Sequence, residues 1–412
     1  MKSITRGFIL ILFGFLFCHA PIFGQKKFDL EEDFNSRYQV KSWNVDNSNF
    51  SNSVLSVIQS DIGHLWIGTF EGLYRFDGLN FKRIDLDRNY EDLFLNYTFW
   101  AVLEDSQKNI WFGSNGGGIV VYNSKESIYQ KIEDKKIENE IIISLFEDSK
   151  GIIWAGTRNH LLKIQNQQVE IIKLKGFPSL AVRSFCEDKN GVLWLGTQNN
   201  GLIAIQNDQV IQSYNTETGL LSNQVYSLFI DNEDTFWIGT TEGLLFFDSG
   251  KLTPYPLYSI KTNAFPVIQS FFQDTEDSTF WIGTEEGLVH LKNRTQFFID
   301  NLPDNRITSI NRDVEGNIWV GTHHEGLLRL KKSDFFSKSA ISFVSGLIWY
   351  LKKKSEALGK NICTLPHVIT LSTVNIEYLL EIMMQEVEVR SLMIPFKDAM
   401  ERNAGQQLAG QT

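Results

Sequence analysis

A tetrad of the form Trp-x-Gly-(Thr/Ser) recurs along the chain and constrains its fold more than any other feature. It begins at seven tryptophans: Trp66, Trp111, Trp154, Trp194, Trp237, Trp281 and Trp319. Successive copies are 45, 43, 40, 43, 44 and 38 residues apart. A period of about 40–45 residues is typical of repeats in which each copy forms one small four-stranded sheet.

Every repeat has the same order of parts, which predicts its strands and turns. A run that ends in Asp or Ser is followed by a tight turn, the tryptophan strand, a loop and an apolar strand. Asp and Ser side chains accept hydrogen bonds from backbone N–H groups two residues on, so we expect them to stabilise the tight turn. These residues are Ser60, Asp105, Asp148, Asp188, Asp231, Asp274 and Asp313. Seven such sheets around one axis predict an all-β, seven-bladed β-propeller over residues 35–332.

Two further positions support a closed ring. A small residue recurs within the first strand of each repeat: Ser56, Ala101, Ser144, Ser184, Ser227, Ser270 and Ser309. Innermost strands crowd around the axis, where small side chains are needed. The seventh repeat lacks an outer strand, and a spare strand at 38–43 precedes the first repeat. We expect this N-terminal strand to complete the seventh sheet and to remove an exposed edge.

The repeats resemble the two-component regulator propeller repeat, whose phrase is Ser-Val-x-x-x-x-Asp-x-x-Gly-x-Leu-Trp-Ile-Gly-Thr-x-x-Gly-Leu-x-x-Phe. Residues 61–78 are a close instance, and the resemblance covers about residues 35 to 332. It implies the periplasmic sensor region of a membrane histidine kinase or hybrid two-component regulator. Members of this family often respond to carbohydrate breakdown products, so the resemblance implies a small-molecule or oligosaccharide ligand.

The flanking segments predict export and leave the signalling partner open. Lys2 and Arg6 stand beside an apolar run at 8–17, and Gly24 offers a small residue for cleavage, so residues 1–24 are interpreted as a signal peptide. The chain is therefore expected to be exported, to the periplasm or the cell surface. Residues 333–412 are an unassigned tail, helical in part, in which we find no kinase sequence. The resemblance implies a membrane sensor-kinase partner or a kinase region beyond this tail.

One position of the innermost strands departs from the common pattern and predicts the ligand site. The residue before each small residue varies from repeat to repeat. By contrast, the residue two places before the small residue and the residue one place after it are apolar in every repeat. We expect this position to line the channel mouth, with aromatic rings stacking on a sugar and polar groups bonding its hydroxyls or a uronate. The candidates here are Trp100, Arg183, Tyr226, Gln269 and Thr308. Loops after the tetrads add Arg158, His160, Asn199, Glu242, Glu285, His323 and His324.

Other functions were weighed against ligand sensing. A formal net charge of −10 argues against nucleic acid as a partner, because binding a polyanion needs a basic surface. His323 and His324 are the best metal or acid–base candidates, but adjacent residues of a strand point to opposite faces. We therefore expect no metal, no cofactor and no catalytic residue. A protein-interaction scaffold is the alternative, and a propeller lyase or hydrolase is a weaker one.

Overall fold

The computed structural model describes residues 38–332 except 49, 85–97, 249, 258–264, 293–294, 300–301 and 305. The predicted signal peptide (1–24) and the predicted tail (333–412) lie outside the described residues. Within the described part of the chain, no helix is both long enough and apolar enough to cross a lipid bilayer.

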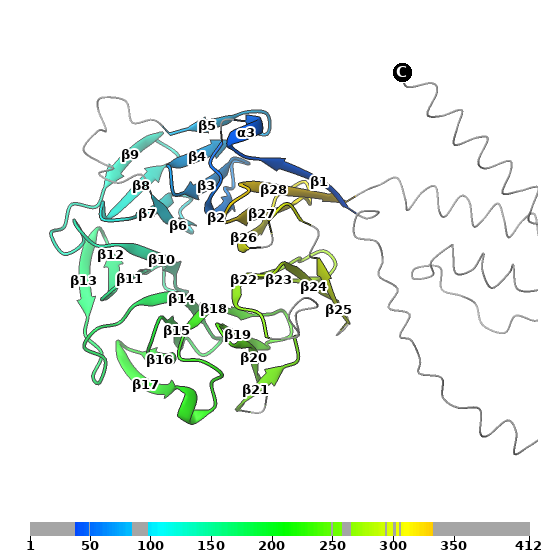
Figure 1. The fold of residues 1–412 in the computed structure, drawn as a ribbon. Coiled ribbons are helices and arrows are strands. Elements are labelled where there is room, and N and C mark those ends of the chain that lie inside the picture. The colour runs from blue at the N-terminus through cyan, green and yellow to red at the C-terminus, as the bar shows by residue number, and fades with distance from the viewer. Residues whose placement is uncertain are drawn as a thin grey trace, which may run out of the picture. The chain divides into compact units, whose positions relative to one another are not determined.

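Seven four-stranded antiparallel sheets, here called blades, are formed by the described residues and stand around a common axis (Figure 1). Each blade is given from its innermost to its outermost strand. Blade one holds β2 (Val54–Gln59), β3 (Leu65–Thr69), β4 (Leu73–Phe76) and β5 (Phe81–Arg83). Blade two holds β6 (Phe99–Glu104), β7 (Ile110–Ser114), β8 (Ile119–Asn123) and β9 (Ile128–Lys131). Blade three holds β10 (Ile142–Glu147), β11 (Ile153–Thr157), β12 (Leu161–Gln165) and β13 (Gln168–Ile172).

The remaining blades repeat this plan. Blade four holds β14 (Val182–Glu187), β15 (Leu193–Thr197), β16 (Leu202–Gln206) and β17 (Gln209–Tyr214). Blade five holds β18 (Val225–Ile230), β19 (Phe236–Thr240), β20 (Gly243–Asp248) and β21 (Lys251–Tyr255). Blade six holds β22 (Ile268–Gln273), β23 (Phe280–Thr284), β24 (Leu288–Lys292) and β25 (Thr295–Ile299). Blade seven holds β26 (Ile307–Arg312), β27 (Ile318–Thr322), β28 (Leu327–Lys332) and β1 (Tyr38–Trp43).

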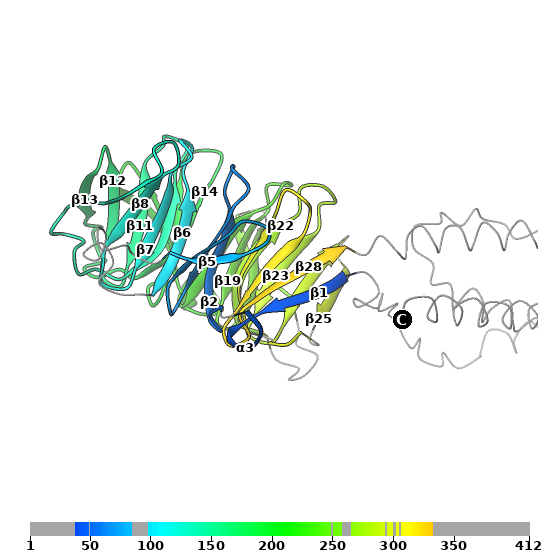
Figure 2. The same cartoon turned by 90° about the horizontal axis from the view of Figure 1, so that it is seen from above.

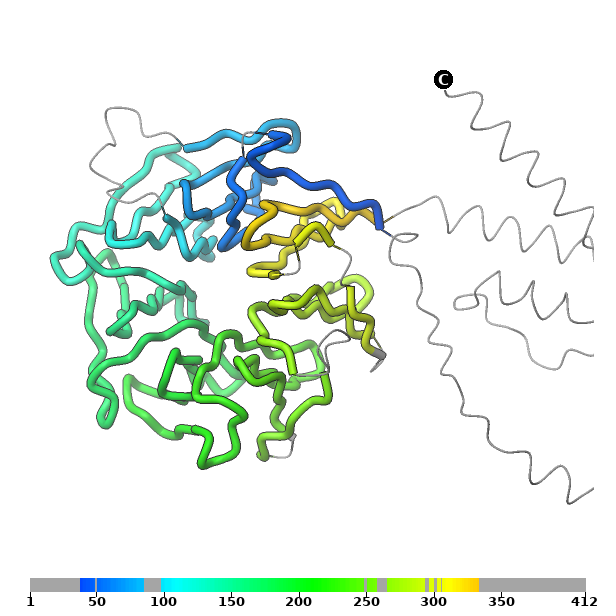
Figure 3. Tube along the Cα trace, viewed as in Figure 1, coloured from blue at the N-terminus to red at the C-terminus, as the bar shows by residue number. Residues whose placement is uncertain are grey.

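The N-terminal strand closes the ring, as the sequence predicts. β1 pairs antiparallel with β28 in a register that runs from Tyr38↔Lys332 to Trp43↔Leu327. Figure 2 shows the two strands side by side, and in Figure 3 the blue start of the described chain lies beside its yellow end. The short helix α3 (Val45–Ser48) then leads into blade one. Blades seven and one are thus joined by the chain itself, which confirms the seven-bladed propeller with N-terminal closure.

The repeated tryptophans fill the space between neighbouring blades. Trp66, Trp281 and Trp319 are almost completely buried, whereas Trp194 keeps partial exposure. In five blades the indole N–H donates to the Asp that closes the innermost strand, at 2.7–3.2 Å: Trp111 to Asp105, Trp154 to Asp148, Trp194 to Asp188, Trp237 to Asp231 and Trp319 to Asp313. The same carboxylate accepts turn N–H groups, as expected, so one Asp connects the turn to the core.

Blade one lacks this link, and restoring it is expected to stabilise the protein. Ser60 stands in the Asp position, and the buried N–H of Trp66 has no acceptor among the described residues. Ser60→Asp is expected to raise the free energy of unfolding by about 1 kcal/mol at pH 7, because a buried donor gains an acceptor. Chemical denaturation measures the change. Asp148→Ser is the matched control and should destabilise; a Ser60→Asp variant that also destabilises would contradict the argument.

The glycine of each tetrad is required by the approach of the next blade. A Cβ placed on Gly156 would lie 2.2 Å from the carbonyl oxygen of Val182, in blade four, and 2.4 Å from Oγ of Ser144. The other tetrad glycines meet the following innermost strand in the same way. Ser144 is one of the recurrent small residues, and its hydroxyl donates to Val182 O at 2.8 Å. The small residue and the glycine therefore allow close packing of adjacent blades.

In five blades the last residue of the innermost strand accepts a backbone N–H of the preceding blade. We call the face that carries the Asp turns the turn face. Here Glu104 accepts the N–H of Asp61 at 2.9 Å, and Glu187 accepts that of Ser149 at 2.6 Å. Gln59 of blade one accepts the N–H of Val314, in blade seven, at 2.7 Å. These bonds between blades were not predicted from the sequence.

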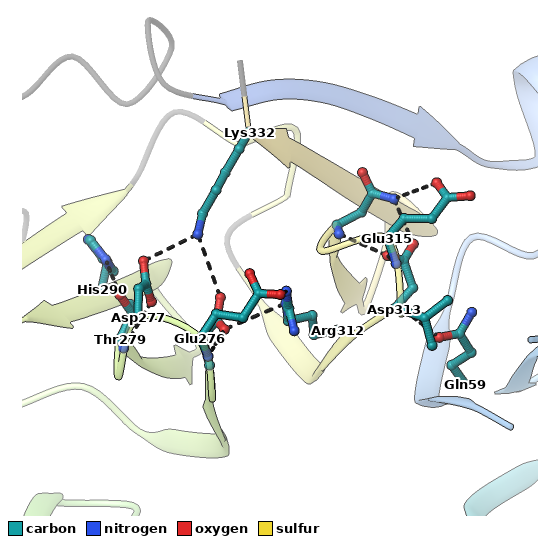
Figure 4. A network of polar contacts seen from close by, with 12 residues as sticks. Gln59, Glu276, Asp277, Thr279, His290, Arg312, Asp313, Glu315 and Lys332 are labelled. Atoms are coloured by element: carbon teal, nitrogen blue, oxygen red, sulfur yellow. Dashed lines mark hydrogen bonds and ion pairs between the residues drawn. The ribbon is translucent and has the colours of Figure 1, made fainter. Parts of the chain in front are cut away.

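A charged network joins blades six and seven on the turn face (Figure 4). Lys332 lies 3.2 Å from Asp277, and Arg312 forms ion pairs with Asp274 and Glu276. Burial alone would raise the pKa of Asp277, but its hydrogen bonds with Thr279 and the ammonium of Lys332 outweigh this and hold the pKa well below its usual range. The carboxylate of Asp277 is therefore ionised at neutral pH, and it pairs with Lys332 at the end of β28.

Candidate ligand-binding site

A β-bulge is built into the innermost strand of every blade, and the bulged residue is the variable one. In blade one, Val54 pairs with Thr69 and Ser56 pairs with Gly68, so Leu55 has no partner of its own in the ladder. The other six innermost strands shift register at the same place. A bulge redirects the side chain of the extra residue. This explains why packing leaves the position free to vary.

We call these seven residues the axial ring: Leu55, Trp100, Ile143, Arg183, Tyr226, Gln269 and Thr308. All seven are half-buried. They lie near the start of the innermost strands, on the face that also carries the loops after the tetrads, here called the loop face. The scaffold thus presents one side chain from every blade near the axis, and each keeps some exposure to solvent.

Side chains of blades four and five form a polar cluster at the axial ring. The guanidinium of Arg183 lies over the ring of Tyr226, 4.1 Å from its centroid. Nη1 of Arg183 donates to Oε1 of Gln198 at 2.9 Å. The hydroxyl of Tyr226 donates to Oε1 of Gln224 at 3.0 Å. Two predicted residues, Arg183 and Tyr226, are therefore brought into direct contact.

Side chains of blades one, two and seven form an aromatic cluster beside the axial ring. Trp100 packs edge-on against Phe70, with ring centroids 5.4 Å apart, and Phe70 packs against His323 at 5.8 Å. The indole N–H of Trp100 is buried and has no acceptor among the described residues. Burial lowers the pKa of His323, and the charges of Arg306 and His324 lower it further, so this imidazole is neutral near pH 7.

A third group connects blades six and seven. Gln269 donates to Oε1 of Glu285 at 3.0 Å, and Arg306 donates to the same oxygen at 3.2 Å. The carboxylate of Glu285 is therefore already paired with a cation. This group offers an amide and a neutralised ion pair rather than free charge.

Other predicted residues have different surroundings. The hydroxyl of Thr308 donates to the carbonyl oxygen of Val54 at 2.7 Å, so it bonds the neighbouring blade. His160 pairs with Glu140 at 2.9 Å. The remaining loop candidates are exposed, and the structure does not bring them together: Arg158, Asn199, Glu242 and His324.

The site residues predicted from the sequence did not include Phe70, Gln198, Gln224 and Arg306, although Phe70 and Gln198 belong to the variable loops after the tetrads. Phe70 and Gln198 directly follow the tetrad, and their backbone N–H groups bond Ser53 O and Ala181 O, just before the innermost strands. This places their side chains beside the axial ring. The signal was present in the sequence, because the residue after the tetrad differs in all seven repeats: Phe70, Asn115, Arg158, Gln198, Thr241, Glu285 and His323.

The described chain holds one cysteine, Cys186, and several His, Asp and Glu side chains. In the described part of the chain, no three His, Cys, Asp or Glu side chains are arranged to hold a metal ion. Burial raises the pKa of the Cys186 thiol to about 12, so it stays protonated at neutral pH. The arrangement at the loop face is suited to binding through stacking and hydrogen bonds.

Fold and site together define a repeat propeller with its varied side chains at one end of the axis. The sequence model of the two-component regulator propeller matches residues 93–116, 136–159, 176–199, 219–242 and 301–324. The model thus matches five segments of the propeller, which confirms the resemblance drawn from the sequence.

The chain is also similar to individual proteins of two-component systems. The histidine kinase P4 of Formosa agariphila is 27% identical over 230 residues, a match that covers 49% of this chain and 15% of that protein. The extracellular domain of a hybrid two-component system from B. thetaiotaomicron matches with a TM-score of 0.61 and 25% identity, over 74% of this chain and 42% of that chain. The chain therefore spans less than half the length of either relative.

Two further structures show the fold alone. A second extracellular domain of a B. thetaiotaomicron hybrid two-component system gives a TM-score of 0.56 at 22% identity, over 72% of this chain and 39% of that chain. Virginiamycin B lyase from Staphylococcus aureus gives 0.56 at 14% identity, over 71% of this chain and 99% of the lyase. The same architecture thus occurs in extracellular domains of two-component systems and in an enzyme, so the fold does not define the function.

Proposed function

We propose that this chain is the extracytoplasmic ligand-sensing propeller of a two-component signalling system, and that it binds a carbohydrate-type ligand at the loop face. One observation carries the proposal. Seven blades repeat one packing plan, yet the bulged residue of each differs, and these residues are half-buried around the axis. Varied side chains on a rigid, repeated scaffold are typical of a binding site.

The chemistry of the axial ring supports a sugar. Trp100 and Phe70 supply aromatic surface, and Trp100 keeps a buried N–H without an acceptor among the described residues. Gln198, Gln224 and Gln269 supply amides that both donate and accept hydrogen bonds. A sugar ring combines apolar C–H faces with hydroxyls that donate and accept, so it matches such a mixture of groups.

The relatives support a proposal for location and partner. One similar structure is the extracellular domain of a hybrid two-component system, and one relative is a histidine kinase. We propose that this chain is likewise exported, through the segment 1–24, and acts with a membrane histidine kinase. The propeller itself would then bind ligand without catalysis, as the sensor relatives suggest.

Calorimetric titration and thermal unfolding of the whole chain test this function. The probes are trisaccharides of glucose, xylose, mannose and galacturonate. We expect one or more to bind saturably and to raise the melting temperature, because a ligand of the folded state stabilises it. Trp100→Ala should weaken that binding about 10-fold or more, since stacking on one ring contributes about 1–3 kcal/mol.

The control is Leu79→Ala, which changes an 87% exposed side chain in a loop of the turn face. Its binding should equal that of the unchanged chain. Failure of every sugar to bind would contradict the proposal. Capture of a protein partner with no effect of any sugar would instead favour the interaction scaffold.

A further inference from the structure

Arg183 is a cation of the loop face that has only neutral partners. Its Nη1 bonds the amide oxygen of Gln198, and its guanidinium stacks on Tyr226. Nε is buried and has no acceptor among the described residues. No carboxylate of the described chain forms an ion pair with it, and Tyr226 is the one group whose charge affects its pKa.

Among the other cations of the propeller, Arg75 and Arg329 lie over indole rings in the third strands of their blades, without an ion pair among the described residues. Several others are compensated by carboxylates. Arg312 pairs with Asp274, Lys163 lies 2.6 Å from Asp208, and Arg306 pairs with Glu285 beside the axial ring. Arg183 alone carries a formal charge among the seven residues of the ring. In a chain with a net charge of −10, the axial ring thus carries a single positive charge, and no carboxylate of the described residues forms an ion pair with it.

Such a cation is costly in the free protein. Burial removes water from a charged group and disfavours its charged form, and it lowers the pKa of Arg183 although the guanidinium remains charged. Placing a charge in this position without a counter-charge destabilises the fold. A bound anion would remove that penalty, so the arrangement stabilises an anionic ligand relative to a neutral one.

We propose that the ligand is an acidic sugar, and that its carboxylate binds the guanidinium of Arg183. This inference rests on the proposed function and names its ligand class. A carboxylate is planar, and it matches the fork of N–H donors on a guanidinium better than a neutral hydroxyl does. Tyr226 holds the plane of the guanidinium from one side, and Gln198 fixes Nη1. The neighbouring amides remain for the hydroxyls of the same sugar ring.

The test compares one sugar in its charged and neutral forms. Trigalacturonate and its methyl ester are titrated against the whole chain, together with trimannuronate and a sulfated galactose trisaccharide. We expect a uronate trisaccharide to bind at least about 10-fold more tightly than the ester, since hydrogen bonds to charged groups contribute about 1.5–3 kcal/mol. Arg183→Gln should lower the affinity for the uronate to about that for the ester and so remove this preference.

The matched control is Lys189→Gln, which removes the same charge from the turn-face loop of the same blade. There Lys189 is paired with Asp234, and the variant should keep the preference for the acid. A second readout needs no ligand: Arg183→Gln should raise the melting temperature of the free protein, because the uncompensated cation is gone.

The outcomes separate the two proposals. Equal binding of acid and ester, unchanged by Arg183→Gln, would overturn the acidic ligand and leave the sugar-sensing function standing. Binding of the sulfated trisaccharide alone, lost in Arg183→Gln, would replace the carboxylate by a sulfate ester. No binding of any sugar, acidic or neutral, would overturn both proposals.

Discussion

Deletion of β1 is expected to lower the free energy of unfolding by about 5 kcal/mol or more and to make the protein self-associate. The strand contributes a six-residue ladder with β28 and buries Tyr38 and Trp43. Each hydrogen bond contributes about 0.5–1.5 kcal/mol and each buried large apolar side chain about 1.5–3 kcal/mol. Without β1, the free edge of β28 is available to pair with another chain.

Chemical denaturation and light scattering of a chain that lacks residues 38–43 measure both effects. Gln39→Ala is the control, because Gln39 lies on the same strand with an exposed side chain and should change stability by less than about 0.5 kcal/mol. A synthetic peptide of residues 38–44 should restore monomers when added to the deleted chain. A deletion variant that stays monomeric and equally stable would show that β1 does not close the ring.

Trp319→Ala is expected to lower the free energy of unfolding by about 3–5 kcal/mol. Trp319 is 1% exposed and stacks on Trp43 of β1, with ring centroids 5.3 Å apart. It also contacts Phe76 of blade one and donates to Asp313 at 2.7 Å. Truncation leaves a cavity where blades seven and one meet, and it removes a hydrogen bond from a buried carboxylate.

Trp194→Ala is the comparison, because Trp194 occupies the same place in its repeat but is only half-buried. Trp194→Ala should lower the free energy of unfolding by less, about 2 kcal/mol. Denaturant midpoints of the two variants at one pH give the difference. Equal decreases in the free energy of unfolding for the two variants would contradict the argument that Trp319 stabilises the closure between blades seven and one.

Much of the fold could be predicted from the sequence, because each repeat contains the residues that form its strands and turns. The spacing of the tetrads predicted seven blades, and the spare strand at 38–43 predicted the closing partner of β28. The Asp that follows six of the innermost strands was expected to stabilise a turn by accepting N–H groups, and it does. Ser60 of blade one, expected to do the same, instead donates to His64 O. The second role of the Asp, as acceptor for an indole six residues later, was missed, because a turn motif does not show which side chain folds back onto it.

The candidate site was accessible only in part. Variation next to the small residue located the axial ring, whereas the bulge that redirects this side chain is a property of strand pairing. Thr308 looks equivalent to Arg183 and Tyr226 in the sequence, yet its hydroxyl bonds Val54 O across the closure between blades seven and one. That contact joins residues 254 positions apart, so no local pattern reveals it.

By itself, the sequence determined the number of blades, their strands and the strand that closes them. These depend on periodic burial and turn chemistry, which act between residues close together in the chain. The tertiary structure alone decided which varied side chains meet: Arg183 with Tyr226 and Gln198, and Trp100 with Phe70. Such contacts arise between blades and between strand and loop, where ring closure sets the distances. The lack of a counter-charge for Arg183, on which its proposed role depends, is visible only there.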